Sequence, residues 1–291
     1  MNSIRRLVSS NQIFVKMVAP FTSLILFLQN ISSYHKSKKK YRTWKKKNPD
    51  TLFKTKEKLI FKIFKDVSSL SRVLLDFENY EIKETKLVKK IIKNDMTVID
   101  AGANFGWYSL NFAKLIGNNS KSKIYSFEPI PKVYKELNLN IKLNQYKNIK
   151  TFNYALGSKN SNVKLGTPYF SFIGSSGATS EFLNFSKKIN CKMFKIDTIV
   201  KLKKIKKIDF IKADIEGGEL NLLKGAEKTL LSHKPKIFIE IVDIHCARFG
   251  HTQHDVIKFL IDRNYKGFFI NNRLSKINLK KPQNGNYLFV K

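Results

Sequence analysis

A glycine-bearing turn between a short apolar run and a helical segment constrains the fold of this chain more than any other feature. The segment Val98-Ile-Asp-Ala-Gly-Ala-Asn-Phe-Gly-Trp-Tyr-Ser109 has the pattern of a strand that passes into a turn and then into a helix. Gly102 and Gly106 lack side chains, so a ligand can lie against the backbone beside the unpaired N–H groups of the helix start. The Asp-x-Gly-x-x-x-Gly spacing differs from the Gly-x-Gly-x-x-Gly of dinucleotide-binding folds. We therefore expect an α/β fold with a nucleotide-type cofactor at this turn.

A second strand-like run, Ile124-Tyr-Ser-Phe-Glu-Pro129, ends in the carboxylate of Glu128. A carboxylate can accept hydrogen bonds from both hydroxyls of a ribose, and Pro129 ends the strand just beyond it. The alternative is a solvated glutamate at a strand end. Because the glycine turn precedes it in the sequence, we favour Glu128 as a ribose-binding residue.

A third run, from Ile208 to Gly225, has a buried-strand pattern followed by carboxylates around a Gly-Gly turn. Asp214, Glu216 and Glu219 therefore crowd one strand end. Like charges packed so closely cost free energy unless a cation, a proton or a ligand offsets them, and such clusters often mark functional sites. From Glu219 onward the apolar spacing becomes helical.

Together these segments resemble the FkbM-type, S-adenosylmethionine-dependent methyltransferases. The resemblance rests on Val-Ile-Asp-Ala-Gly-Ala-Asn-Phe-Gly, on Phe-Glu-Pro followed by Asn140, on Ile-Lys-Ala-Asp-Ile-Glu-Gly-Gly-Glu with Leu-Leu-Lys-Gly-Ala, and on Phe-Ile-Glu-Ile at 238–241. It extends over residues 85–291 and leaves the first 75 uncovered. It implies a class I methyltransferase fold, a Rossmann-like, mostly parallel seven-stranded sheet with helices on both faces.

The same resemblance implies S-adenosylmethionine as cofactor and O-methylation of a hydroxyl on a small molecule or glycan. The cofactor contacts that it implies are Asp100, Gly102, Asn104, Gly106, Glu128, Ala155 and Asp214. We expect no nucleic-acid acceptor, because the sequence has no Asn-Pro-Pro-Tyr or Asp-Pro-Pro-Tyr motif.

Methyl transfer to a hydroxyl needs the donor and acceptor on one axis and a group that takes up the hydroxyl proton. Asp214, Glu216, Glu240 and His245 follow the carboxyl ends of strand-like runs, where ligands bind in open α/β sheets. We expect Asp214, Glu216 and His245 to be catalytic, although a histidine after a strand is often structural.

His245, His251, His254 and Asp255 lie close together in sequence, but their spacing matches no known metal-binding class. We therefore expect no metal. If one binds, the acidic cluster at Asp214 suits Mg²⁺ best.

Strand-like and helical runs alternate after Val98, which favours βαβ units and a parallel sheet. The last two strand-like runs, Gly267–Ile270 and Tyr287–Val290, are expected to form a hairpin-like pair. We expect residues 52–93 to be helical and residues 157–207 to form a lid or polar loop containing Gly174-Ser-Ser-Gly177. The remaining strands are expected at Val98–Ala101, Lys123–Phe127, Thr151–Tyr154, Phe210–Ala213 and Ile237–Ile241.

The chain has a formal net charge of +33, which ordinarily indicates a nucleic-acid or anionic-membrane partner. Lys, Ile, Asn and Phe are enriched together, however, as an AT-rich genome would produce without selection for binding. The first 49 residues hold eleven Lys or Arg and no Asp or Glu. We divide the chain into a basic extension, residues 1–75, and a catalytic domain, residues 76–291.

Within the extension, the apolar segment 17–31 is short for a membrane span and is followed by a basic run that suits an anionic membrane surface. A solvated charge run is the alternative. Cys191 and Cys246 are the only cysteines, and their isolation favours a reducing compartment. We expect a cytoplasmic protein that can associate with a membrane.

Two other functions remain open from the residues. A nicotinamide-dependent oxidoreductase also pairs a glycine turn with a ribose-binding acid, but the Gly-x-Gly-x-x-Gly spacing is missing. A non-catalytic, basic membrane- or nucleic-acid-binding protein would explain the charge but not the cofactor motifs.

Overall fold

The computed structural model describes residues 42–63, 81–118, 122–168, 186–271 and 273–291. The chain divides into two units, residues 1–50 and residues 51–291. In the first unit, residues 42–47 are helical. The apolar segment 17–31 and the Gly174–Gly177 stretch lie outside the described residues, and the boundary expected after residue 75 stays a prediction. Within the described ranges, every helix is too short or too polar to cross a membrane.

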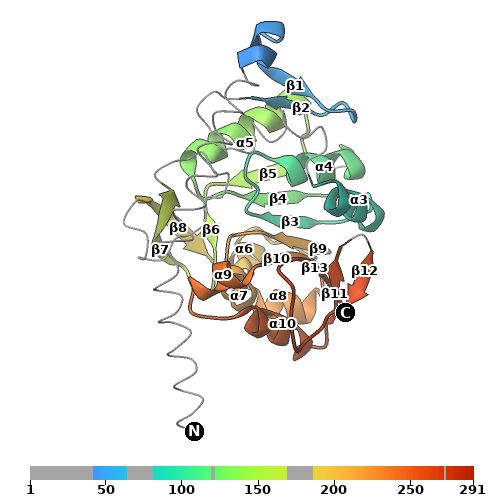
Figure 1. The fold of residues 1–291 in the computed structure, drawn as a ribbon, viewed down its shortest axis with the longest axis vertical. Coiled ribbons are helices and arrows are strands. Elements are labelled where there is room, and N and C mark those ends of the chain that lie inside the picture. The colour runs from blue at the N-terminus through green and yellow to red at the C-terminus, as the bar shows by residue number, and fades with distance from the viewer. Residues whose placement is uncertain (1–41, 64–80, 119–121, 169–185, 272) are drawn as a thin grey trace. The chain divides into compact units, whose positions relative to one another are not determined.

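An eight-stranded sheet forms the centre of the second unit (Figure 1). Five neighbouring strands pair in parallel, in the order β10-β9-β3-β4-β5. The mostly parallel sheet expected from the sequence is therefore confirmed, with one strand more than the seven expected. In the order of the sheet the strands are β12 (Leu274–Lys276), β11 (Lys266–Ile270), β13 (Gly285–Val290), β10 (Lys236–Ile241), β9 (Phe210–Ala213), β3 (Val98–Ala101), β4 (Ile124–Phe127) and β5 (Ile149–Phe152).

The C-terminal strands give the sheet its distinguishing topology. Strand β13 pairs antiparallel with both β10 and β11, and Gly267 of β11 lies opposite Phe289 of β13. The expected hairpin-like pair is therefore present, and β12 extends it as the extra edge strand. A doubly wound dinucleotide-binding sheet is mostly parallel, in the order 3-2-1-4-5-6, whereas here the antiparallel β13 separates β10 from β11. This arrangement is the one that the class I methyltransferase resemblance implies.

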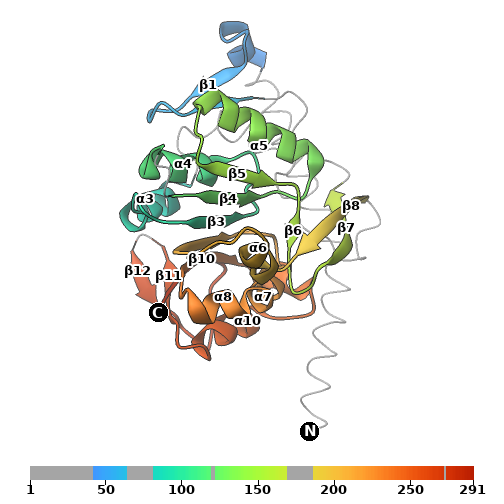
Figure 2. The same ribbon diagram turned by 180° about the vertical axis from the view of Figure 1, so that it is seen from behind.

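Apolar side chains alternate between the two faces of the sheet, and helices cover both (Figures 1 and 2). Ile237, Ile239 and Ile241 of β10 belong to one apolar cluster, whereas Phe238 belongs to the other. This alternation is what a strand buried on both faces requires. The first cluster packs against α6 (Ile196–Leu202), α7 (Glu219–Lys224), α8 (Glu227–Ser232) and α10 (Gln253–Ile261), and the second against α3 (Ile82–Ile91) and α4 (Trp107–Ile116).

The expectation of a helix over residues 52–93 is wrong for its first part. Residues 52–62 form an antiparallel hairpin of β1 (Leu52–Lys54) and β2 (Ile60–Lys62), while α3 accounts for 82–91. Leu59, Phe61 and Ile63 are all buried, so the apolar residues follow the period of two that marks a strand. Side chains of α5 (Pro131–Asn144) hold this hairpin: Asn144 Oδ1 accepts from the N–H of Ile60 at 2.9 Å.

The described parts of the segment 157–207 also contain more secondary structure than expected. A three-stranded sheet forms from β6 (Ala155–Leu156), β7 (Ser161–Pro168) and β8 (Ser186–Phe194), and α6 follows it. Lys and Asn are depleted in strands generally, and they are frequent in β7 and β8. Because of these residues the sequence pattern indicated a polar loop. The pairing of β7 with β8 overrides that preference.

Candidate functional site

The glycine turn brings the ends of β3 and β9 into close contact. Gly102 has a φ of 73°, and a Cβ atom there would lie only 1.9 Å from the carbonyl oxygen of Asp214. Only glycine allows this approach. The next residues complete the turn: Asn104 has a positive φ of 50°, and Gly106 directly precedes α4. The structure therefore places Gly102 against Asp214, with Asn104 and Gly106 in the same turn, and contact of these residues with the cofactor stays a prediction.

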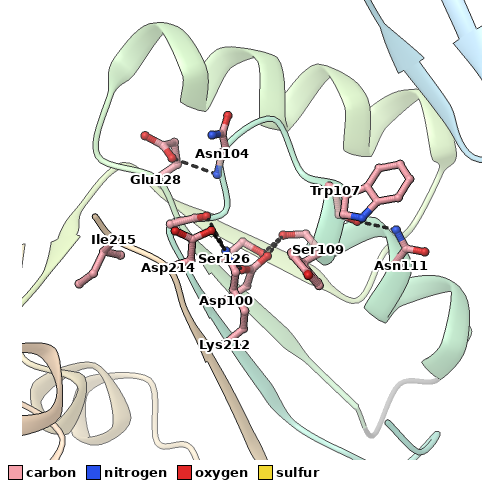
Figure 3. Close-up of polar contacts among 12 residues, drawn as sticks. Asp100, Asn104, Trp107, Ser109, Asn111, Ser126, Glu128, Lys212, Asp214 and Ile215 are labelled. Carbon is pink, nitrogen blue, oxygen red and sulfur yellow. Dashed lines mark hydrogen bonds and ion pairs between the residues drawn. The ribbon is translucent and has the colours of Figure 1, made fainter. Parts of the chain in front are cut away.

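Glu128 lies at the end of β4 with its carboxylate turned toward the glycine turn (Figure 3). Its Oε2 accepts a hydrogen bond from the N–H of Asn104 at 3.0 Å, and its Oε1 accepts one from the N–H of Ile130 at 2.9 Å. Burial raises the pKa of this carboxyl to about 7, although the two N–H groups favour the ionised form. Each oxygen keeps one acceptor position, so Glu128 can still accept hydroxyl groups.

Asp100 belongs to the central strand β3, and its side chain is fully buried. Its Oδ2 accepts a hydrogen bond from the Ser109 hydroxyl at 2.6 Å, and Ser109 contacts the Ser126 hydroxyl at 2.8 Å. Burial raises the pKa of Asp100, while Lys212 opposes that shift. These contacts indicate that Asp100 orients the turn, and a direct cofactor contact at Asp100 stays a prediction.

The acidic segment after β9 meets the segment after β10. Acid or imidazole atoms of Glu216, Glu240 and His245 all lie within 4.8 Å of one another. His245, on α9 (Asp243–Ala247), has its Nδ1 at 3.1 Å from Glu216 Oε2. The two atoms are in contact but do not meet the geometry of a hydrogen bond. The structure therefore brings together Glu216 and His245, two of the three residues expected to be catalytic, with Glu240, which the sequence also offered as a candidate base.

Gly217 makes this meeting possible. It has a φ of 110°, and a Cβ atom there would lie 2.2 Å from the carbonyl oxygen of His245. Glu219 holds the same loop, because its Oε1 accepts hydrogen bonds from the N–H groups of Ile215 and Gly217 at 3.0 and 3.2 Å. Glu219 is 1% exposed, so these bonds indicate a structural role.

The environment sets different proton affinities within the cluster. Burial, then the nearby Asp214 carboxylate, raises the pKa of Glu216 to about 7 and that of Glu240 to about 9. Burial, then the nearby Arg248 cation, lowers the pKa of His245. At neutral pH the His245 imidazole is therefore neutral and able to accept a proton.

The other predicted residues occupy more peripheral places. Asp214 lies between the glycine turn and the acidic cluster, with its side chain 30% exposed. Ala155 follows β5 and pairs with Met193 in the small sheet. Asp255 forms a capping box with Thr252 at the start of α10, so its side chain has a structural role there. Among the described residues, the Glu216–Glu240–His245 group alone has atoms close enough to hold a metal ion.

Sequence reasoning missed Lys212, whose buried side chain points between Asp100 and Asp214 (Figure 3). The sequence feature that could have identified Lys212 is a lysine within a buried-strand pattern, because lysines are rarely buried unless they are paired with an acid.

This sheet order is that of the class I methyltransferase fold. Residues 100–267 match the model of the methyltransferase FkbM domain, and the chain belongs to this family. The methyl donor of the family is S-adenosylmethionine. A search of curated proteins gave no match.

Several solved methyltransferase structures are similar to this chain. A methyltransferase FkbM from Methylobacillus flagellatus is 16% identical with a TM-score of 0.45, over 77% of this chain, which spans 56% of the length of that structure. A SAM-dependent methyltransferase from Aquifex aeolicus is 15% identical with a TM-score of 0.40, over 73% of this chain and 91% of that one. Fibrillarin from Aeropyrum pernix, crystallised with S-adenosyl-L-methionine, is 11% identical with a TM-score of 0.41, over 72% of this chain and 73% of that one.

The residues present fit such a cofactor. Glu128 is almost fully buried, yet its oxygens have acceptor positions left beside a turn without side chains at Gly102 and Gly106. Asp214 adds a partly exposed carboxylate on the other side of Gly102. These carboxylates can accept hydrogen bonds from the hydroxyls of a ribose and can attract a positively charged group of the ligand.

Proposed function

We propose that this protein transfers a methyl group from S-adenosylmethionine to a hydroxyl group of a small molecule or glycan. The observation that carries the proposal is the contact between His245 Nδ1 and Glu216 Oε2 at 3.1 Å, beside the glycine turn. A hydroxyl keeps its proton at neutral pH, so its methylation needs a proton acceptor near the donor. The contact supports the proposal because His245 follows a strand end, where ligands bind in open α/β sheets, and a neutral imidazole can accept a proton.

Bound S-adenosylmethionine supplies an electrophilic methyl group on a sulfonium. Glu128 would hold the ribose hydroxyls, while Gly102 and Asn104 would let the nucleoside lie against the turn. Asp214, between the turn and the acidic cluster, would face the charged end of the cofactor. Positioning of this kind accounts for much of the rate in a displacement that needs no covalent protein intermediate.

His245 and the glutamates form the acceptor side of the site. Glu216 Oε2 lies beside Nδ1 of the imidazole, so Nε2 is the nitrogen that would accept the hydroxyl proton. Burial holds a proton on Glu240 at neutral pH, so Glu240 is suited to donate a hydrogen bond to an acceptor oxygen. A polyhydroxylated acceptor offers both the hydroxyl that loses its proton and neighbouring oxygens that accept one.

Methyl transfer from labelled S-adenosylmethionine to a panel of sugars and other hydroxylated molecules tests this function. We expect a labelled product whose methyl group survives mild base, as an ether does and an ester does not. Mass spectrometry of the product locates the methyl group. Methylation of amines or of nucleic acid alone would contradict the proposal.

We also propose that the basic extension holds the protein at an anionic membrane surface, because the first 49 residues carry eleven Lys or Arg without an acidic residue. Replacing Lys38, Lys39, Lys40, Lys45 and Lys46 by Gln in the full chain should release it from vesicles that contain anionic lipid. Binding of the unaltered chain should also weaken as salt rises through about 0.1 M, where the screening length is near 10 Å. Equal retention of both chains would exclude this tether.

A further inference from the structure

A buried lysine lies between the aspartates of the two central strands. Lys212 belongs to β9 and lies directly opposite Asp100 of β3 in the parallel register. Asp214 follows two residues later, so the alternation of side chains places all three residues on one face of the sheet. Figure 3 shows the lysine between the two carboxylates. Its side chain is only 3% exposed.

The ammonium group of Lys212 contacts the glycine turn itself. Its Nζ donates a hydrogen bond to the carbonyl oxygen of Gly102 at 3.1 Å. It also lies 3.4 Å from Asp214 Oδ2 and 3.7 Å from Asp100 Oδ1. The Tyr108 ring, with its centroid 5.1 Å from Nζ, covers the group. One cation therefore joins the turn to both strands.

Burying a lysine and its acidic partners costs free energy, which suggests that the group has a functional role. Burial disfavours the charged lysine, but the charges of Asp214, Asp100 and Glu81 outweigh it and hold the pKa of Lys212 above its usual range. An apolar residue of similar length would fill the space without this cost. Removing the charge would leave Asp100 and Asp214 facing one another across the turn without a counter-charge.

We propose that Lys212 is the positioning residue of the cofactor site, tying the Gly102 carbonyl to the Asp100 and Asp214 carboxylates and keeping both carboxylates ionised. The inference rests on the proposed function, because the sulfonium of the methyl donor is the ligand charge that these carboxylates attract. The neutral thioether left after methyl transfer lacks that charge. Because Lys212 holds the two carboxylates ionised and in place, it preserves their preference for the donor over the product.

Titration calorimetry of the full chain tests this role, with S-adenosylmethionine and S-adenosylhomocysteine as the two probes. K212M removes the charge and keeps much of the volume. F210L is the matched control, because Phe210 is a buried residue two positions earlier on the same face of β9. We expect K212M to bind S-adenosylmethionine at least tenfold more weakly, and F210L to stay within twofold of the unaltered chain.

Proton release, measured in two buffers of different ionisation enthalpy, separates charge balance from simple loss of structure. Without Lys212, one of the two carboxyls keeps its proton, and the arriving sulfonium displaces it. We therefore expect K212M to release more protons than the unaltered chain with S-adenosylmethionine, but not with S-adenosylhomocysteine.

Affinity of K212M within twofold of the unaltered chain, or equal proton release by the two chains, would overturn the inference. If K212M does not fold, K212R carries the test, since its planar guanidinium cannot reproduce the three contacts of Nζ. K212R should fold and bind at least fivefold more weakly, and unchanged binding would overturn the inference. Failure of the unaltered chain to bind S-adenosylmethionine would instead overturn the proposed function.

Discussion

Hydrogen bonding separates the roles of the glutamates at the strand ends. One carboxylate oxygen of Glu219 accepts two backbone N–H groups, and these bonds hold the loop after β9. Glu216 lies a few residues away, retains partial exposure and contacts His245. Glu240 completes the group, with a pKa that burial raises to about 9. Residues of one type therefore divide into a loop support, a partner for the imidazole and a proton holder.

His245→Ala should lower methyl transfer by at least about tenfold while cofactor affinity stays near normal, since a general base contributes roughly 10² to 10⁴ in rate. Burial lowers the pKa of His245, so the unaltered enzyme should lose activity as the pH falls below about 6.5 and the imidazole becomes charged. The variant should lack this acid limb. Steady-state rates at several pH values and calorimetry check both points.

Asp214→Asn is the companion variant and should reduce turnover as much or also weaken cofactor binding. If His245→Ala instead keeps full turnover between pH 6 and 9, the histidine is structural and the proton acceptor lies among the carboxylates.

At the scale of secondary-structure elements, loops after β9 and β10 meet because Gly217 allows α9 to lie against the segment that follows β9. The strands and the turn were predictable, since runs such as Val98–Ala101 are apolar and end in glycine or an acid. The pairing of Glu216 with His245 was not, because it depends on a contact between loops that are distant in sequence. Strands β7 and β8 escaped prediction since their Lys and Asn residues disfavour strands in isolation.

Gly217→Ala should reduce turnover by at least about tenfold, because its Cβ would meet the carbonyl oxygen of His245 and displace α9. Gly250→Ala is the matched control: Gly250 also has a positive φ, of 75°, but a Cβ there meets nothing within 4 Å. Each substitution should lose about 1 to 2 kcal/mol of stability from backbone strain. Urea unfolding and methyl-transfer rates compare them, and equal turnover in the two variants would show that α9 does not position the histidine.

For the whole molecule, buried carboxyls couple the stability of the fold to pH. Burial raises the pKa of Glu136 to about 8 and that of Glu240 to about 9, from an ordinary value near 4.5. The folded state therefore keeps protons that the unfolded chain has already lost at neutral pH. Their stabilising effect is complete below about pH 4.5 and declines as the pH rises toward 9.

We expect the free energy of unfolding in urea to fall by about 1 to 3 kcal/mol between pH 7 and pH 9. His245 and His251 titrate below this window because burial lowers the pKa of each. Glu240→Gln should remove part of the decline. A stability that rises over this window would show that these carboxyls are ionised in the folded protein.

Titration calorimetry with S-adenosylmethionine and with NAD, on the unaltered chain and on Glu128→Ala, tests the cofactor site most directly. We expect the unaltered chain to bind S-adenosylmethionine and not NAD. Glu128→Ala should lose roughly 2 to 4 kcal/mol of binding free energy, at about 1.5 kcal/mol or more for each hydrogen bond from a ribose hydroxyl to the carboxylate. Binding of NAD without S-adenosylmethionine, or unchanged affinity in Glu128→Ala, would contradict a methyl-donor site at this glycine turn.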